Sequence, residues 1–148
     1  MAVEISTAVM TDSKALADTL VGLVPQLSKS NPPPTLEQVE AMLANEAITQ
    51  FLAREPDGTI VGVATLAVFP IPTGRRAWIE DVIVDEGSSG QGIGALLTTA
   101  MLDHARSLGC VSVDLTSRPS REAANHLYKK LGFQTRDTNV YRMSLEGG

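Results

Sequence analysis

At 148 residues the chain is long enough for one ordinary domain with a hydrophobic core, so we expect a single domain over residues 1–148. A formal net charge of −5 argues against nucleic acid as the main ligand, because phosphate contacts need a basic surface. The apolar content of 43% is typical of soluble globular proteins. No apolar run reaches membrane-spanning length and the first residues do not resemble a signal peptide, so we expect a cytoplasmic protein without a membrane partner.

Helix and strand signals follow one another along the chain without an internal repeat. Thr35 to Gln38 has the form of a capping box, which satisfies the first N–H groups of a helix. Pro56-Asp57-Gly58 is typical of a turn between two strands, and Gly109 ends a helix with regularly spaced apolar residues. In chain order, the sequence first predicts a strand over 3–9, a helix with leucines from 16 to 27 and a short helix through 43. Strands over 48–54 and 60–69, a loop over 70–76 and a strand over 77–84 follow. The last predicted elements are a helix from 92 to 109, a strand over 111–115, a helix over 120–131 and a closing strand over 140–145.

The most informative stretch is an apolar strand, Trp78 to Val84, followed by a short loop and a glycine-rich turn at Gly90-Gln91-Gly92-Ile93-Gly94. The turn opens directly onto an amphipathic helix. Backbone N–H groups and the positive end of the helix dipole converge there, so such a turn binds phosphate or pyrophosphate. We therefore expect a nucleotide-like cofactor, of one of two classes.

A dinucleotide is the first class. Gly90-x-Gly92-x-x-Ala95 satisfies the dinucleotide fingerprint, and Asp114 lies about 20 residues on, where a ribose-binding acid is expected. However, a Rossmann glycine turn follows its strand at once, whereas residues 85–89 intervene here. Too little chain follows the turn to complete a doubly wound sheet, so a nicotinamide-dependent oxidoreductase is the weaker alternative.

Coenzyme A is the second class, and two separate blocks favour it. Val84-x-x-x-x-x-Gly90-Gln91-Gly92-Ile93-Gly94 resembles the acyl-CoA loop of the GNAT superfamily of N-acetyltransferases. Ala124-Asn125-His126-Leu127-Tyr128-Lys129-Lys130-Leu131-Gly132-Phe133 resembles the second hallmark of that family, a helix with Leu-Tyr that ends at Gly-Phe. The resemblance implies an α/β (α+β) fold with a central, mixed, mostly antiparallel sheet, whose fourth and fifth strands splay apart and whose faces carry helices.

The same resemblance implies the activity and the cofactor contacts. It implies transfer of an acetyl group from acetyl-CoA to a primary amine, by direct attack in a ternary complex; the acceptor can be a small molecule or a protein amine. A homodimer is common in the family. A non-catalytic acyl-CoA-binding or regulatory module is the alternative from another class. The cofactor-binding residues that it implies are Val82, Ile83, Val84, Ser89, Gly90, Gln91, Gly92, Ile93, Gly94, Ala95, Arg121 and Tyr128.

Amine acetylation needs a base, an oxyanion donor and an acid for the departing thiolate. The resemblance implies that Glu80 is the base and that a backbone N–H near Val82, where the fourth strand bulges, stabilises the oxyanion. Strand alternation places Glu80 and Asp81 on opposite faces of the sheet, so only one of the two side chains can point into the site. Asp81 as the base, or a water relay, stays an alternative. Tyr128 is the candidate acid, and packing is its other interpretation.

Two positions depart from the family pattern. Ser89 stands where the family usually has arginine or glutamine, and Arg121 stands where many members have an asparagine that reaches the cofactor. Ser89 should weaken pyrophosphate binding, and Arg121 could compensate. The two histidines, His104 and His126, lack a second ligand at metal-site spacing, and Cys110 is the single cysteine, so we expect no metal.

Overall fold

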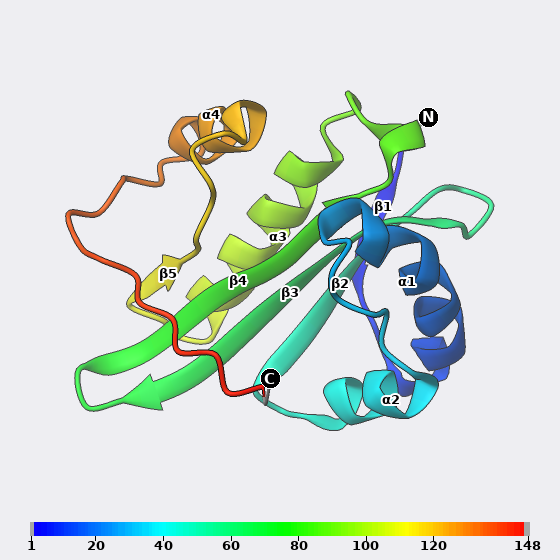
Figure 1. Cartoon of the computed structure of the whole chain (residues 1–148), viewed down its shortest axis with the longest axis horizontal. Coiled ribbons are helices and arrows are strands. Elements are labelled where there is room, and N and C mark those ends of the chain that lie inside the picture. Colours follow the sequence, from blue (N-terminus) through cyan, green and yellow to red (C-terminus); the bar gives the residue numbers. More distant parts are fainter. Residues whose placement is uncertain (1, 147–148) are drawn as a thin grey trace. The chain divides into compact units, whose positions relative to one another are not determined.

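A computed structural model describes residues 2–146 and divides the chain into two compact units, Met1–Thr116 and Ser117–Gly148. The larger unit holds most of the secondary structure (Figure 1). Among its described residues, the second unit holds one helix, α4 (Glu122–Lys130). The elements of the first unit are β1 (Glu4–Thr7), η1 (Met10–Asp12), α1 (Ser13–Leu27), α2 (Leu36–Ala44), β2 (Ile48–Arg54), β3 (Ile60–Ile71), β4 (Gly74–Val84), η2 (Glu86–Ser88), α3 (Ile93–Ser107) and β5 (Ser112–Asp114).

The five strands form one sheet in the order β1-β2-β3-β4-β5 (Figure 1). Neighbouring strands are antiparallel from β1 to β4, and β5 pairs parallel with β4. This confirms the predicted mixed, mostly antiparallel sheet. It also shows that the dinucleotide interpretation was wrong, because a doubly wound dinucleotide fold needs a mostly parallel sheet. Asp114, its candidate ribose ligand, lies in β5 opposite Trp78.

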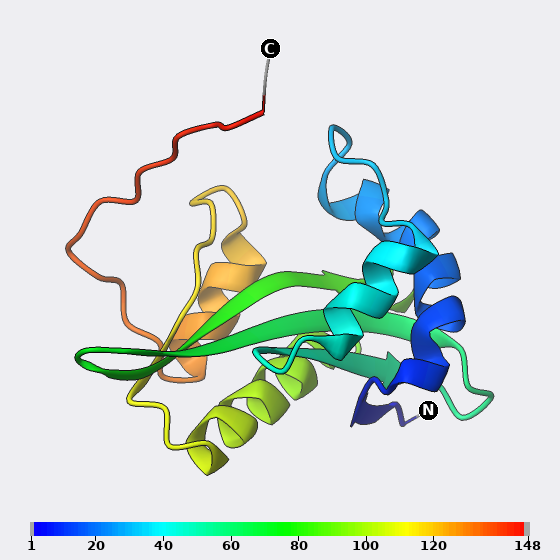
Figure 2. The ribbon, with the colours of Figure 1, turned by 90° about the horizontal axis from the view of Figure 1, so that it is seen from below.

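Helices cover both faces of this sheet (Figure 2). Side chains of α1 and α2, among them Leu16 and Val39, pack with Leu52, Val63 and Ile83 of the strands. On the other face, α3 comes so close that a Cβ at Gly62 would lie 3.0 Å from a methyl group of Ile93. A fully buried leucine contributes about 1.5–3 kcal/mol through the hydrophobic effect, so these two layers hold the sheet in place.

The capping box predicted for α2 is confirmed. The Gln38 N–H donates to Thr35 Oγ1 across 3.1 Å, and the Thr35 N–H donates to Gln38 Oε1 across 2.9 Å. Two N–H groups at the helix start are thereby satisfied, as expected from the sequence.

The loop predicted over 70–76 is wrong, because β3 and β4 continue into a tight hairpin there. Ile71 pairs with Gly74, and the chain turns at Pro72 and Thr73. Prolines are tolerated at this end because the pairs of β3 with β2 stop at Ala67. Pro70 therefore has no β2 neighbour to which it would have to donate a hydrogen bond.

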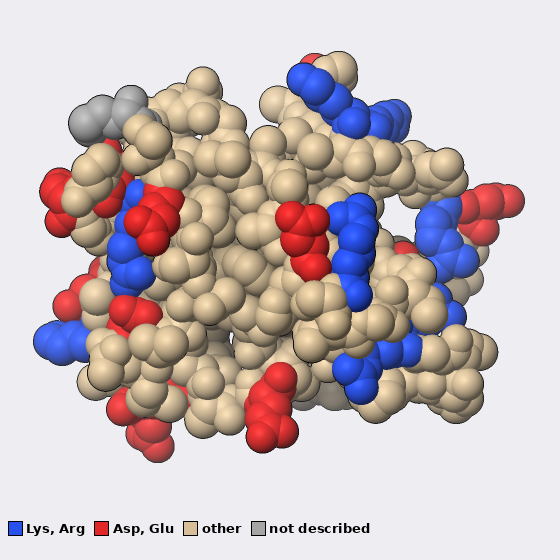
Figure 3. Space-filling view, turned by 180° about the vertical axis from the view of Figure 1, so that it is seen from behind, with Lys and Arg blue, Asp and Glu red and all other residues tan. Residues whose placement is uncertain are grey.

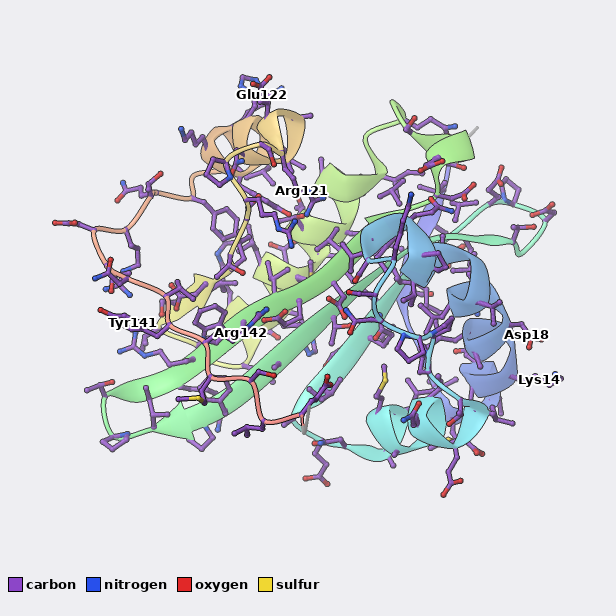
Figure 4. All side chains as sticks on the ribbon, in the orientation of Figure 1. Lys14, Asp18, Arg121, Glu122, Tyr141 and Arg142 are labelled. Carbon is purple, nitrogen blue, oxygen red and sulfur yellow. The ribbon has the colours of Figure 1, made fainter. Side chains whose placement is uncertain are left out.

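The segment 134–146 contains no strand among its described residues, so the closing strand predicted over 140–145 is wrong. Apolar residues alternate with polar ones from Tyr141 to Leu145, which is why the sequence predicts a strand there. A strand also needs a neighbouring backbone for its N–H and C=O groups, and alternation alone does not supply one. Figure 4 labels Tyr141 and Arg142 on this segment, where the apolar side chains from Val140 to Leu145 are 73–91% exposed.

Charged side chains of both signs lie near one another on the surface. Figure 3 shows acidic and basic side chains interspersed on the face that it presents. Lys14 pairs with Asp18 across 3.4 Å on the outer side of α1 (Figure 4). Both side chains are strongly exposed, so this pair contributes little to stability. The less exposed pair of Arg54 and Asp12, at 2.8 Å, joins β2 to η1.

Candidate active site

Strands β4 and β5 separate along the sheet. Their pairs run from Arg76 opposite Ser112 to Trp78 opposite Asp114, whereas β4 continues to Val84. After Trp78, the edge of β4 that faces β5 is therefore no longer paired with β5. Backbone groups there need another partner, which an extended ligand with amide groups can provide. This is the predicted splay of the fourth and fifth strands.

A bulge interrupts β4 at the beginning of this part. Glu80 pairs with Thr65 and Ile83 pairs with Val63, so Asp81 and Val82 together lie opposite one residue of β3. Asp81 has φ 48°, in the left-handed region, where aspartate is tolerated better than most residues. The irregularity lies where the sequence resemblance placed a bulge. It also changes the direction of the backbone groups around Val82.

Glu80 lies on the sheet face that α1 and α2 cover. Its direct partner Thr65 is two residues from Val63, whose side chain packs in the core with those helices. Directly opposed residues of an antiparallel pair share a face, and so do alternate residues of one strand. Glu80 is exposed and takes part in at least one polar interaction. Asp81 is exposed too, but the bulge ends simple alternation immediately after Glu80.

The loop after β4 leads into the glycine turn. The Asp85 N–H donates to Val61 O across 2.8 Å, which fixes the start of the loop on β3. Gly90 and Gly92 have φ values of 82° and 73°, a conformation that side chains other than glycine disfavour. The N-cap of α3 is Gly92, and the first intrahelical hydrogen bond runs from the Leu96 N–H to Gly92 O.

The position of that hydrogen bond determines which N–H groups of the turn are available to a ligand. The N–H groups of Ile93, Gly94 and Ala95 precede it and therefore have no intrahelical partner. Together with the positive end of the α3 dipole, they suit an anion such as a pyrophosphate. Ser89 is exposed at the end of η2, with its N–H 3.3 Å from Glu86 O. Its neighbour Ser88 is buried.

Gln26 of α1 was missed by sequence reasoning although it holds this loop. Its Nε2 donates to Asp85 Oδ1 across 2.9 Å, and its Oε1 accepts the Glu86 N–H at the same distance. The sequence shows only a polar residue near a helix end. No local pattern could have connected it to a loop so far along the chain.

Tyr128 and Arg121 belong to the second unit. Tyr128 is buried in α4 and its ring contacts the edge of Phe133, with 5.7 Å between centroids. Burial raises the pKa of Tyr128 above its usual value of 10.0, and the charge of Arg121 partly offsets this. Arg121 and Glu122 project to different sides of the helix start (Figure 4). The Arg121 carbonyl accepts hydrogen bonds from the backbone and side chain of Asn125.

His104 of α3 agrees with a packing role in the first unit, whereas His126 is exposed on α4 of the second unit. His104 contacts the ring of Phe51 edge-on, with 5.7 Å between centroids, and its Nε2 lies 3.4 Å from Thr49 Oγ1. Among residues 2–146, no group of three or more His, Cys, Asp or Glu side chains is arranged to hold a metal ion. Over the same residues, no helix combines the length and apolarity needed to cross a membrane.

A family model described as the acetyltransferase (GNAT) family matches residues 19–133. This chain belongs to the GNAT family. The matched part contains every site residue that the sequence analysis singled out, from Glu80 to Tyr128. Members of the GNAT family use acetyl-CoA as a cosubstrate, so the family agrees with the ligand that the splayed strands and the glycine turn suit.

Named GNAT relatives match the chain over parts of their length. A glucosamine 6-phosphate N-acetyltransferase of Trypanosoma brucei brucei is 39% identical over 96 residues, which is 63% of both chains. A mycothiol acetyltransferase of Propionibacterium freudenreichii is 32% identical over 60% of this chain but only 28% of its own length. The chain thus spans less than two thirds of these relatives.

A solved GNAT structure matches over nearly all of both chains. The crystal structure of an acetyltransferase from Trypanosoma brucei has a TM-score of 0.77 and 27% sequence identity. The match covers 97% of this chain and 99% of that one. The splayed sheet is thus the fold of an acetyltransferase.

Proposed function

We propose that this protein transfers an acetyl group from acetyl-CoA to a primary amine by direct attack within a ternary complex. The observation that carries the proposal is one continuous arrangement in a GNAT member. β4 separates from β5, bulges at Asp81, and leads through a short loop into a left-handed glycine turn at the start of α3. This combination offers amide partners and an anion site along one strand and its loop.

The residues present fit the cosubstrate. The N–H groups at the start of α3 suit the pyrophosphate, and glycine at 90 and 92 keeps the turn free of side chains. The β4 backbone from Val82 to Val84 suits the amides of the pantetheine arm. Ser89, Gln91 and Arg121 complete the proposed contacts. When bound, acetyl-CoA supplies an activated thioester.

Glu80 is proposed as the base. It takes one proton from the protonated amine, either directly or through one water, and leaves a neutral nitrogen whose lone pair bonds to the carbonyl carbon. A backbone N–H at Val82, in the bulge, is proposed to stabilise the developing oxyanion. Asp81 is the alternative base, since it is also exposed.

Tyr128 is proposed as the acid that protonates the sulfur when the carbon–sulfur bond breaks. Support comes from its place in the Leu-Tyr-x-x-x-Gly-Phe block and from its buried phenol, which is protonated at neutral pH and whose pKa burial raises further. The same raised pKa makes transfer to a thiolate, whose own pKa is about 8.5 in a free thiol, unfavourable outside the transition state. Tyr128 is therefore proposed to donate its proton while the carbon–sulfur bond breaks, and not earlier.

Acetyl-CoA binding is tested by thermal unfolding. Ligand at about 100 times its dissociation constant stabilises a protein by about 2.7 kcal/mol, which raises Tm by roughly 5–10 °C for a domain of this size. We expect this rise with acetyl-CoA and none with NAD(H). An unchanged Tm at millimolar acetyl-CoA contradicts the proposal.

The acceptor is tested by release of the CoA thiol in the presence of different amines. The trypanosomal relative is named for glucosamine 6-phosphate, so this amine is the first to test. An aminoglycoside, a polyamine, an amino acid and a peptide with a free N-terminus complete the panel. Thiol release that depends on one of these amines supports the proposed transfer.

A non-catalytic acyl-CoA-binding module is the second candidate, and Ser89 favours it. The family usually has a cation or an amide at that position, and this chain has a small hydroxyl instead. A rise in Tm with acetyl-CoA, combined with no thiol release for any amine, would support the binding module over the enzyme.

A further inference from the structure

A row of polar residues crosses three strands on the face that carries Glu80. Gln50 of β2 pairs with Thr65 of β3, and Thr65 pairs with Glu80 of β4. The next row along the same face is apolar, with Leu52 and Val63 in the core beneath α1 and α2. Polar residues at the centre of a sheet are costly unless they are hydrogen-bonded, so this row needs an explanation.

Hydrogen bonds satisfy the side-chain amide of Gln50, the first residue of this row. It is only 3% exposed, and both ends of its amide are used. Its Nε2 donates to Ala64 O across 3.0 Å, which fixes the orientation of the amide. Its Oε1 then accepts the hydroxyl of Thr65 across 2.8 Å.

This bond decides what Thr65 can offer a ligand. A threonine hydroxyl has one hydrogen to donate and two lone pairs that accept. The hydrogen of Thr65 is committed to Gln50, so its oxygen can only accept a further bond. Thr65 is partly exposed beside Glu80, whose carboxyl oxygens also accept hydrogen bonds.

We infer that Thr65 Oγ1 and Glu80 together bind the two N–H groups of the acceptor amine, with Gln50 as the positioning residue that holds Thr65 in its accepting state. A neutral primary amine has two N–H groups and one lone pair. When one N–H donates a hydrogen bond to Glu80 and the other donates one to Thr65 Oγ1, the lone pair is left to attack the carbonyl carbon. This inference rests on the proposed function, and it assigns to Thr65 a preference for primary amines.

The test compares a primary amine with its N-methyl derivative, which has only one N–H to share. The amine is one that the unaltered protein acetylates, with glucosamine 6-phosphate tried first. Thr65→Val keeps the shape but removes the accepting oxygen. We expect its kcat/KM for the primary amine to fall about 2- to 10-fold, which is what a single hydrogen bond provides, with little change for the N-methyl amine.

Two further variants keep the test decisive. Thr65→Ser retains the hydroxyl and should retain the preference for the primary amine. Thr65→Cys keeps a weak donor for Gln50 but offers only a weak acceptor, so it should lose the preference without leaving Gln50 unpaired. Thr49→Val is the matched control: Thr49 precedes Gln50 on β2, and its hydroxyl contacts His104 on the opposite face. Thr49→Val should leave kcat/KM unchanged for both amines.

Each outcome has one meaning. Equal losses for both amines in Thr65→Val and Thr65→Cys would show that Thr65 only supports the fold, and unchanged kinetics would also overturn the inference. The inference is also overturned if Thr65→Val and Thr65→Cys keep the preference for the primary amine. If the unaltered protein acetylates no amine in the panel, the proposed function fails and this inference fails with it. A rise in Tm with acetyl-CoA in each variant shows that the cofactor part is folded.

Discussion

Gln26 and Asp85 join the last turn of α1 to the loop that leads into the glycine turn. Nε2 of Gln26 lies 2.9 Å from Asp85 Oδ1 and 3.1 Å from the carbonyl of Gly22 in its own helix. Its Oε1 accepts the N–H of Glu86, the first residue of η2. One side chain thus sets where this loop begins relative to α1, and the loop in turn carries Ser89 and Gly90.

Gln26→Ala should therefore weaken acetyl-CoA binding. Removal of the side chain leaves Asp85 and Glu86 to water, and the loop gains freedom that ligand binding must then restrict. Each such hydrogen bond contributes about 0.5–1.5 kcal/mol, so we expect a dissociation constant several-fold higher. Titration of acetyl-CoA by calorimetry measures it.

Lys14→Ala is the matched control for Gln26. It also removes an exposed polar side chain from α1, but its partner is Asp18 on the same helix (Figure 4). Acetyl-CoA affinity should stay unchanged in this variant. If both variants weaken binding equally, α1 acts through its general stability and Gln26 has no specific role.

Glu80→Gln should slow amine acetylation most at low pH. Most of the amine is protonated there, so assistance by a base matters most, and the loss should shrink as pH approaches the pKa of the amine. A positioned base typically contributes 10²–10⁴-fold, and we expect a loss of about 10²-fold near neutral pH. A pH profile of kcat/KM for both proteins measures it.

Asp81→Asn is the comparison variant for Glu80. Asparagine tolerates the left-handed conformation of Asp81 as well as aspartate does, so the bulge should be preserved. A larger loss in Asp81→Asn than in Glu80→Gln would assign the base to Asp81. Equal and small losses in both would favour a water relay.

Tyr128→Phe should lower kcat while the affinity for acetyl-CoA stays nearly unchanged. The hydroxyl is needed mainly as the carbon–sulfur bond breaks, so its removal affects the transition state more than the ground state. We expect a decrease of about 10- to 100-fold, at the lower end of acid catalysis. If pre-steady-state kinetics show chemistry to be rate-limiting and kcat is nonetheless unchanged, Tyr128 is only a packing residue.

Tyr128 should also make the fold sensitive to alkaline pH. Burial raises its pKa above 10.0, so the folded protein keeps a proton that the unfolded chain releases. Stability is then complete below the unfolded pKa near 10 and is lost as pH rises through the higher folded value. Thermal unfolding across this range should show the loss in the unaltered protein and not in Tyr128→Phe. Tyr141→Phe, at a tyrosine that is 87% exposed, is the matched control and should behave as the unaltered protein.

Local signals in the sequence predicted much of the fold. β2 begins and ends where the sequence predicts it, before the Pro-Asp-Gly turn, and the Thr35 capping box opens α2 with both of its hydrogen bonds. These features depend on residues close together in the chain. The separation of β4 from β5 was implied by the family resemblance and not by composition.

Features that depend on distant partners were harder to predict. The hairpin at Pro72 and Thr73 tolerates its prolines because the pairs of β3 with β2 stop at Ala67, which no pattern within 70–76 reveals. The positions of Gln26 and Gln50 follow from the packing of α1 beside the loop and from the register of β2 on β3. Likewise, alternation placed Glu80 and Asp81 on opposite faces, but the bulge that follows Glu80 depends on the pairing with β3.

Ser89→Arg should tighten acetyl-CoA binding. Ser89 is exposed at the end of η2, with extended backbone at φ −64° that arginine adopts without strain. It precedes the turn whose N–H groups suit a pyrophosphate, and a guanidinium adds a charge-assisted, potentially bidentate contact to a phosphate. At an exposed site this contributes on the order of 1 kcal/mol, or several-fold in affinity.

The salt dependence of this gain separates a phosphate contact from other causes. A contact near solvent is screened by salt, so the gain should be largest at low ionic strength and should shrink when salt is added. Ser89→Gln, which adds length without charge, should show a smaller gain with little salt dependence. If Ser89→Arg binds no tighter at low salt, Arg121→Ala decides why. A weakening in Arg121→Ala that Ser89→Arg reverses would show that Arg121 already serves the phosphates; no weakening would show that the loop does not approach them as proposed.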